Sequence, residues 1–585
     1  MTGVKTYNRR KMLILFCMIF AVAMFLVGRL GYIMIGRGAY YSELAQDLHE
    51  RERAIKAPRG RILDRNGVVL AGNRPVCTIS VIHSQVTDPE QVVRELTQRL
   101  GLSEDEVRSK VEKLSSREKI KSNVDKAVAD EIRALHMDGV MVDEDYKRYY
   151  PFDDMASRVL GFTGADNQGI VGLEVEYDAI LQGTDGYILT MTDANGIELA
   201  NTAEARKEPI PGQDLCISLD SNIQAYVQQE AEKTLIAKEA IGVSIIVMNP
   251  KNGEIYAMVN APEYNLNEPY TLNTGETGLS QEEQQNALNQ MWRNFCINDT
   301  YEPGSIFKTV TATAAFEKGV LTVEDIFVCP GYRIVGDRMI RCHKTTGHGQ
   351  ETFRQGIMNS CNPVFMDVGL RTGTDAMYHT YEQLGLMQKT GIDLPGEAGS
   401  IMHKQEDVTE IDLAIMSFGQ SFQITPMQLI TAVSAIVNGG NRITPHFGMY
   451  TVDEQGNRLE TYTHPVEEGV ISPETSATMR ELMEAVVAEG SGRKGQVEGY
   501  RIGGKTATSE KLPRGNGKYI SSFIGVAPAD DPQVITLVLI NEPTGIYYGG
   551  TIAAPVAQRI YENILPYLGI EAVYAAEEPQ TEVGE

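Results

Sequence analysis

The sequence is short of basic residues. Its 585 residues include 53 Lys and Arg against 78 Asp and Glu, a formal net charge of −25. A chain this acidic repels phosphate backbones, so we expect no nucleic-acid partner. No tandem repeat or low-complexity tract stands out before residue 571, which argues against a repeat architecture. The length is enough for two or three domains, each with its own core.

Long apolar runs are absent after residue 35, so we predict a single membrane span. The one such run covers residues 12–35, and Met12 to Gly28 carries no charge. This is roughly the length that crosses a bilayer. A cleaved signal peptide is the alternative, but the run is long for one, and Gly28 to Tyr32 is a poor cleavage site. Four basic residues precede the run: Lys5, Arg9, Arg10 and Lys11.

The positive-inside rule keeps those four basic residues in the cytoplasm. We therefore predict a cytoplasmic tail at residues 1–11 and an uncleaved, single-pass anchor at residues 12–35. The rest of the chain would lie outside the cell membrane. An extracytoplasmic location also permits disulfides.

C-x-x-C pairs are also absent, which argues against a common type of zinc site. Six of the seven cysteines lie outside the predicted span. Cys329 and Cys342 are the nearest pair and flank a Pro-Gly turn, so they form either a disulfide or two reduced thiols. Cys342, His343 and His348 are a conceivable metal-ligand pattern. Without a C-x-x-C pair we predict no metal site and no cofactor.

Residues 36–215 predict an extended, mixed α/β domain next to the membrane. A polar helix is expected over residues 39–53, and residues 91–114 have helical spacing. Between them, Asn66-Gly67 separates two short apolar runs and predicts a hairpin. Residues 146–186 are rich in Gly and Tyr and contain short β-type runs. No nucleophile constellation is present in this domain.

Residues 216–570 predict a second domain, of the α+β class. Helical segments occupy its middle, and strands lie at both ends, so we expect one sheet that the C-terminal strands complete. Residues 571–585 are acidic and predicted to be disordered. The outer elements are predicted as helices at 221–235 and 553–565, the latter ending at Pro566, and as strands at 243–248, 254–259, 499–508, 519–527 and 533–541.

Ser305 and Lys308 are the first candidate catalytic pair. They follow a Pro-Gly break and begin an apolar run, which predicts a helix start with both side chains on one face. A partly desolvated lysine can take the serine proton and make the hydroxyl a nucleophile. The pattern is weak by itself, because a capping serine with a solvated lysine looks the same. It also occurs at Ser116-Lys119 and Ser491-Lys494.

Two further motifs supply partners for this pair. Ser360 and Asn362 form an S-x-N on a loop, and Lys505-Thr506-Ala507-Thr508 ends a predicted strand. In this order, S-x-x-K, a Ser-Asn loop and K-T-G form the set found in penicillin-recognising enzymes. A literal K-T-G lies at Lys389–Gly391. It follows a predicted helix and runs into a loop, so we predict that it is outside the site.

With all three motifs, the sequence resembles the class B penicillin-binding proteins. These are membrane-anchored D,D-transpeptidases of bacterial cell-wall synthesis, and modest length favours a division or sporulation type over an elongation type. The resemblance implies a transmembrane helix, a mixed α/β pedestal or dimerisation domain, and a transpeptidase domain with an antiparallel sheet and a helical subdomain. It runs to about Leu568 and includes Arg59 to Gly67, Arg148 to Pro151, Gly172 to Glu174, Ser417 to Gln420, Thr425-Pro426 and Gln428-Leu429.

The resemblance also implies a mechanism. The serine would attack the carbonyl between the last two D-alanines of a peptidoglycan stem peptide, and β-lactams would acylate the same hydroxyl. A second lysine would lower the pKa of the first and keep it neutral. It assigns catalysis to Ser305, Lys308, Ser360 and Lys505, substrate binding to Asn362, Thr506 and Thr508, and the oxyanion hole to the backbone N–H groups of Ser305 and Thr508.

Several alternatives remain on the same fold. A D,D-carboxypeptidase or a β-lactamase shares the motifs, but neither needs the long region before residue 216. A catalytically inactive scaffold would not need intact motifs. Residues 36–215 do not resemble a glycosyltransferase, so we expect a glycan-polymerising membrane protein as partner. Ala507 replaces the usual Gly of the third motif, and its methyl group could narrow the site or change β-lactam affinity.

Overall fold

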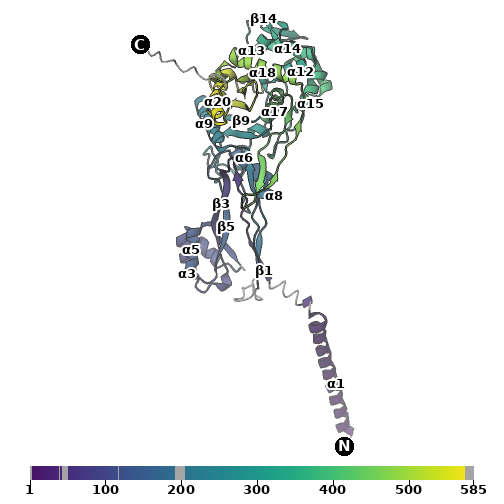
Figure 1. Ribbon diagram of the computed structural model, residues 1–585. Coiled ribbons are helices and arrows are strands. Elements are labelled where there is room, and N and C mark those ends of the chain that lie inside the picture. The colour runs from purple at the N-terminus through teal and green to yellow at the C-terminus, as the bar shows by residue number, and fades with distance from the viewer. Residues whose placement is uncertain (1–2, 39, 42–49, 116, 192–204, 573–585) are drawn as a thin grey trace, which may run out of the picture. The chain divides into compact units, whose positions relative to one another are not determined.

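The computed structural model describes residues 3–38, 40–41, 50–115, 117–191 and 205–572, which belong to two compact units (Figure 1). The chain contributes three segments to each unit. Unit 1 comprises Met1–Pro58, Arg74–Lys147 and Gly183–Pro211, and unit 2 comprises Arg59–Asn73, Arg148–Gln182 and Gly212–Glu585.

The predicted anchor is helical. Helix α1 (Gly3–Gly31) continues into a π-helical turn, η1 (Tyr32–Gly36). Among the described residues, Arg9–Gly36 is the one stretch long and apolar enough to cross a membrane. In the part of the chain that the structure describes, none of its apolar side chains is buried by protein. Of the predicted disordered tail, residues 573–585 lie outside the described residues.

Unit 1 has its own small core. The apolar faces of its helices pack on the strands, with Ile79, Val93 and Leu96 fully buried. The region predicted to be helical over residues 91–114 is two helices. The elements of this core are α3 (Pro89–Leu100), α4 (Glu104–Val111), α5 (Lys126–Ala134), β3 (Val69–Val81), β4 (Glu118–Asp125) and β5 (Val140–Tyr149).

The helix predicted over residues 39–53 is wrong in its last part. Residues Glu50–Ile55 form strand β1, which pairs antiparallel with β6 (Gly186–Met191). Strand β6 also pairs with β7 (Ala205–Lys207). A partner strand far away in the sequence decides the conformation here, because strand preference depends on context more than on the residues themselves. Residues 42–49 lie outside the described residues.

The Asn66-Gly67 hairpin of unit 2 is confirmed. Strand β2 (Ile62–Leu63) pairs with the start of β3, and Gly67 adopts a left-handed conformation with φ of 84°. The buried Asp64 carboxylate accepts the backbone N–H groups of Asn66 and Val68, at 2.8 Å each. Strand β2 also runs parallel to β8 (Asp214–Ile217), which pairs with β16 (Gly448–Val452).

Residues 146–186 form fewer strands than predicted. Their β-type runs fold mainly into three short helices. Each helix is only four or five residues long. They are α6 (Ser157–Leu160), α7 (Gly172–Glu176) and α8 (Asp178–Leu181).

A buried ion cluster holds α7 and α8 to the start of the segment that carries the hairpin. The Glu174 carboxylate accepts from Arg59 Nε and Arg148 Nε, both at 2.7 Å. Arg59 also donates to Asp178, at 2.6 Å, and Tyr150 donates to Glu174 at 3.1 Å. The two guanidinium groups and the Glu174 carboxylate are almost fully buried. Three sequence segments that resembled the family without any assigned chemistry thus meet at one structural contact.

The predicted sheet of the second domain is present and fully antiparallel. Its strand order is β10-β9-β21-β20-β19, so the C-terminal strands complete a sheet that the N-terminal ones begin. Strand β19, which carries Lys505, lies at its edge. The strands are β9 (Gly242–Met248), β10 (Ile255–Ala261), β19 (Gly503–Glu510), β20 (Tyr519–Ala527) and β21 (Val534–Asn541).

Helices cover both faces of this sheet. Helices α9 (Ser221–Lys238) and α20 (Ala554–Tyr567) lie together on one face, close to β9 in Figure 1. Helices α12 (Lys308–Glu317), α17 (Pro426–Val437) and α18 (Pro473–Ala488) cover the other face. Helix α20 continues past Pro566, where we expected it to end, because a proline in the last turn removes only one helical hydrogen bond.

The helical middle is confirmed, but it contains four short strands that the sequence did not reveal. These strands form two small antiparallel pairs, β11 with β14 and β12 with β13. Each has four residues, too few for a clear alternation of apolar and polar side chains. They are β11 (Ile326–Cys329), β12 (Tyr332–Val335), β13 (Arg338–Arg341) and β14 (Gly349–Thr352).

Candidate active site

The first motif lies where a 3-10 turn becomes an α-helix. The turn η3 (Gly304–Phe307) holds Ser305, and Lys308 begins α12. Gly304 is left-handed, with φ of 57°, and a Cβ there would come within 2.4 Å of Ser509 Oγ on β19. Glycine therefore lets the nucleophile's turn press against the sheet edge. Lys308 is fully buried, whereas Ser305 is half-buried.

The second motif brings an amide and a hydroxyl to Lys308. It lies between α13 (Phe353–Met358) and α14 (Asn362–Thr372). The Lys308 ammonium donates to Asn362 Oδ1 and to the Ser360 carbonyl oxygen at 2.7 Å, and to Ser360 Oγ at 3.2 Å. Among the described residues, however, Lys308 makes no hydrogen bond to the Ser305 hydroxyl. Lys308 is thus hydrogen-bonded to the second motif, whereas its three-residue spacing from Ser305 predicted a contact with the serine.

Ser360 adopts a backbone conformation that few serines adopt. Its φ is 55°, in the left-handed region that costs energy for residues with a Cβ. The loop is held by Ser360 N donating to Ile357 O at 3.1 Å and by Cys361 N donating to Gly356 O at 2.8 Å. The strained backbone turns the hydroxyl toward the two lysines.

The third motif supplies the second lysine. Lys505 is fully buried, and its ammonium donates to Ser360 Oγ at 2.9 Å and to the Thr506 carbonyl at 3.1 Å. Burial lowers the pKa of Lys308 from its ordinary value to about 8. Burial and the charge of Lys308 together lower the pKa of Lys505. Two buried ammonium groups around one hydroxyl repel each other, so the pair gives up one proton easily.

The two threonines of the third motif share the other face of β19. Thr506 Oγ1 donates to Ser491 Oγ at 3.2 Å, and Thr508 Oγ1 accepts from the Gly549 backbone N–H at 3.0 Å. Ser491 belongs to another S-x-x-K match, Ser491-Lys494, which has no partner motifs in the sequence. The sequence therefore missed it as a neighbour of the site, because only the fold brings this exposed loop to Thr506.

Ala507, the departure from the family motif, is 4% exposed. Its methyl group lies 3.4 Å from the position that a Cβ on Gly304 would occupy. The methyl group is thus buried against the turn that carries Ser305, on the face of β19 that also bears Lys505. The left-handed glycine leaves room for it.

The literal K-T-G lies outside this group. Residues Lys389–Gly391 are in a loop, as the sequence predicted. Thr390 N and Gly391 N donate to the Glu397 carboxylate, at 2.7 and 3.2 Å. The third S-x-x-K match, Ser116-Lys119, begins at a residue outside the described ones.

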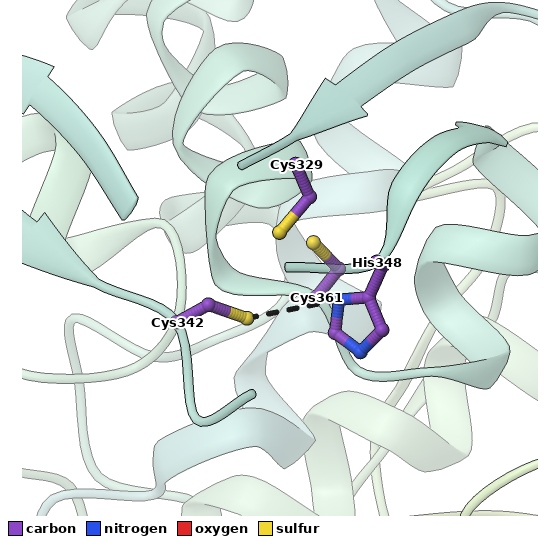
Figure 2. A group of neighbouring side chains, drawn as sticks. All are labelled: Cys329, Cys342, His348 and Cys361. Carbon is purple, nitrogen blue, oxygen red and sulfur yellow. Dashed lines mark hydrogen bonds between the residues drawn. The ribbon is translucent and has the colours of Figure 1, made fainter. Parts of the chain in front are cut away.

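The cysteines next to the site are free thiols. The disulfide considered between Cys329 and Cys342 is not formed. Instead, both lie with two other side chains in a cluster that the sequence did not bring together (Figure 2). We name it the Cys3His cluster: Cys329, Cys342, His348 and Cys361.

Comparisons with known proteins agree with one another. Residues 243–562 match the family described as penicillin binding protein transpeptidase domain, and residues 54–217 match the penicillin-binding protein dimerisation domain. The chain is 38% identical over 569 residues to Stage V sporulation protein D of Bacillus subtilis (strain 168), covering 95% of this chain and 86% of that protein. It is 30% identical over 554 residues to the probable peptidoglycan D,D-transpeptidase PenA of Neisseria meningitidis, covering 92% and 90%.

A solved structure shares the fold at lower identity. Penicillin Binding Protein 2X from Streptococcus thermophilus superposes with a TM-score of 0.74 at 22% sequence identity. The match covers 89% of this chain and 81% of that one. The arrangement of both units' elements is therefore that of a known architecture.

Proposed function

This chain belongs to the penicillin-binding protein transpeptidases, and we propose that Ser305 forms the acyl-enzyme with which it cross-links peptidoglycan stem peptides. One observation carries the proposal: the Ser360 hydroxyl lies between two buried lysines, Lys308 and Lys505, at 3.2 and 2.9 Å. This is a proton path in a site that burial keeps poorly hydrated. Ser305, three residues before Lys308 and half-buried on η3, is available to substrate.

Acylation would proceed in two proton transfers. Neutral Lys308 takes the Ser305 proton as the oxygen attacks the carbonyl between the last two D-alanines. The C–N bond then breaks, and the leaving D-alanine nitrogen receives a proton through the Ser360 hydroxyl. Repulsion between the two buried ammonium groups favours a pair that carries one charge rather than two, which leaves one amine neutral. The half-reaction ends with an ester on Ser305 and a free D-alanine.

The remaining motif residues would bind the substrate. The side-chain oxygen of Asn362 accepts a hydrogen bond from Lys308. Its side-chain nitrogen makes one long contact, 3.4 Å to the Arg341 backbone carbonyl, so this nitrogen can donate to a substrate amide. The hydroxyls of Thr506 and Thr508 would bind the terminal carboxylate. The backbone N–H groups of Ser305 and Thr508 would stabilise the oxyanion.

The molecule that accepts the acyl group from Ser305 determines the product. An amine from a second stem peptide would give a cross-link, whereas water would give carboxypeptidase activity. A β-lactam would acylate Ser305 and leave slowly. The family's dimerisation domain before residue 217 supports the transpeptidase, because a carboxypeptidase or a β-lactamase needs no such domain. An inactive scaffold is disfavoured by the complete set of buried, interacting lysines.

We further propose a cell-membrane location with a cytoplasmic N-terminus. The apolar run at residues 12–35 follows four basic residues, and positive charge is retained on the cytoplasmic side. The catalytic unit would then act outside the membrane, where the substrate is. Because residues 36–215 do not resemble a glycosyltransferase, we propose that a membrane protein that polymerises glycan works with it, in division or in sporulation.

Fluorescent penicillin tests the nucleophile. We expect the wild type and the Lys389→Ala variant to be labelled covalently, because Lys389 belongs to the K-T-G outside the site. We expect Ser305→Ala to remain unlabelled while it keeps the thermal unfolding midpoint of the wild type. Equal labelling of wild type and Ser305→Ala would refute the proposal. A stem-peptide donor with an added amine acceptor then separates cross-linked product from hydrolysed product.

A further inference from the structure

The Cys3His cluster gathers four donor groups that the acyl-transfer chemistry does not use. They come from four separate positions: the end of β11, the residue after β13, the residue before β14, and the residue before α14. Figure 2 shows the three sulfur atoms and the imidazole pointing toward one another. The donor atoms all lie within 4.8 Å of one another, and Cys342 Sγ is 3.8 Å from His348 Nδ1.

These distances are close to those of a tetrahedral metal site. Zn–S bonds of about 2.3 Å and Zn–N bonds of about 2.0–2.1 Å place tetrahedral ligand atoms about 3.6–3.8 Å apart. Small rotations of the side chains would bring the cluster to that size. The cysteines are at most 2% exposed and the His348 side chain 7%, so the site is closed to solvent. Four protein ligands and no open position are typical of structural zinc.

The surroundings also favour a cation. The buried Glu351 carboxylate lies 3.8 Å from His348 Nδ1, and its Oε1 has no hydrogen-bond partner among the described residues. The buried carboxylate, and the thiolates that the cysteines become when they bind metal, would place negative charge that a divalent ion offsets. A disulfide would use two of the three thiols and leave the third, the imidazole and the carboxylate unexplained. Thiolate and imidazole ligands in tetrahedral arrangement select zinc over magnesium or calcium.

We propose that the Cys3His cluster binds one structural zinc ion, which fixes the loop carrying the second catalytic motif. The sequence predicts no metal site, because the pattern of Cys342, His343 and His348 lacks a C-x-x-C pair. The fold supplies the missing ligands from distant positions. His343 is exposed and is not a member, although its Nδ1 is also 3.8 Å from Cys342 Sγ.

The proposed ion would affect catalysis by holding residues of the second motif in position. Cys361 stands between Ser360 and Asn362, the two residues that bind the Lys308 ammonium. A metal bond to Cys361 would hold the left-handed turn at Ser360 against β11 and β13. This part of the inference rests on the proposed function, whereas zinc binding itself does not.

Metal content tests the inference without reference to acylation. The full-length chain, purified in detergent under reducing conditions, is expected to hold one zinc ion per chain by mass spectrometry of the metal. Exchange with Co2+ alone should give the intense visible bands of tetrahedral cobalt and a thiolate charge-transfer band. Cys342→Ser combined with Cys361→Ser should lose both. His343→Ala and Cys216→Ser, a buried cysteine elsewhere, should keep both.

A donor swap keeps the test decisive if the double variant does not fold. His348→Cys should still bind zinc, with a stronger charge-transfer band in the cobalt form. A reduced wild-type chain that takes up neither metal, or a disulfide within the cluster that persists in place of metal, overturns the inference. So does metal binding equal to wild type in the folded double variant. Penicillin labelling, measured separately with and without zinc, should be slower in the zinc-free protein; an unchanged rate refutes the positioning role.

Discussion

Among single residues, Ser360 connects the whole site. Its hydroxyl is hydrogen-bonded to both lysines and its carbonyl to one of them, so three motifs that are far apart in sequence share a single residue. Its left-handed backbone is the cost of that position. Residues in sparsely populated backbone regions cluster at functional sites because the surrounding structure must hold them there.

The pKa of Lys308 predicts how acylation depends on pH. Burial lowers it from 10.5 to about 8, and only the neutral amine can act as base. The penicillin acylation rate should therefore rise about tenfold per pH unit below that pKa and level off above it. Rapid-mixing kinetics between pH 6 and 10 would show a midpoint near 8, provided the fold is intact by circular dichroism at each pH. A rate still rising at pH 10 would contradict this.

Among the elements, the hairpin β2–β3 and the short helix α7 depend on one buried contact. Glu174 is fully buried and pairs with two guanidinium groups, each of which is also nearly inaccessible. The five-residue helix α7 contains too few apolar residues to pack as an ordinary amphipathic helix. Specific ionic contacts therefore hold it, and such contacts are sensitive to the loss of one partner.

Glu174→Gln is expected to destabilise unit 2 strongly. The amide keeps the shape but removes the charge, which leaves buried Arg148 without a carboxylate partner and Arg59 with Asp178 alone. Losing one partner of a buried ion pair costs about 3–5 kcal/mol. Chemical denaturation should show the loss as a lower midpoint. Glu176→Gln, on the exposed side of the same helix, is the matched control and should unfold like the wild type. Equal stability of both variants would mean that the ion cluster contributes little.

At the scale of the whole molecule, the membrane anchor and the catalytic unit are stabilised in different ways. Among the described residues, the apolar helix is not buried by protein, while the five-stranded sheet is covered on both faces. Deleting residues 1–36 should therefore move the protein from the membrane fraction to the soluble fraction. Penicillin labelling should persist at the full-length rate, since all motif residues belong to unit 2. A truncated protein that stays in the membrane fraction would show a second attachment.

The sequence predicted most regular elements of the catalytic domain. Strands β9, β10, β20 and β21 are long apolar runs bounded by turn residues, and local pattern is enough to find such strands. It failed at β1, at the strands β11 to β14 and at the short helices near Glu174. There the partner that fixes the conformation is distant in the chain, and no local period exists to detect.

The sequence by itself determined the family motifs, the order of the domains and the candidate lysines, because these depend on residue identity and spacing. Only the tertiary structure decided that Lys308 bonds to Ser360 and Asn362 rather than to Ser305, and that the methyl group of Ala507 is buried against Gly304. It alone brought four metal-binding side chains together. Distances between residues far apart in sequence are set by packing, which a linear pattern does not contain.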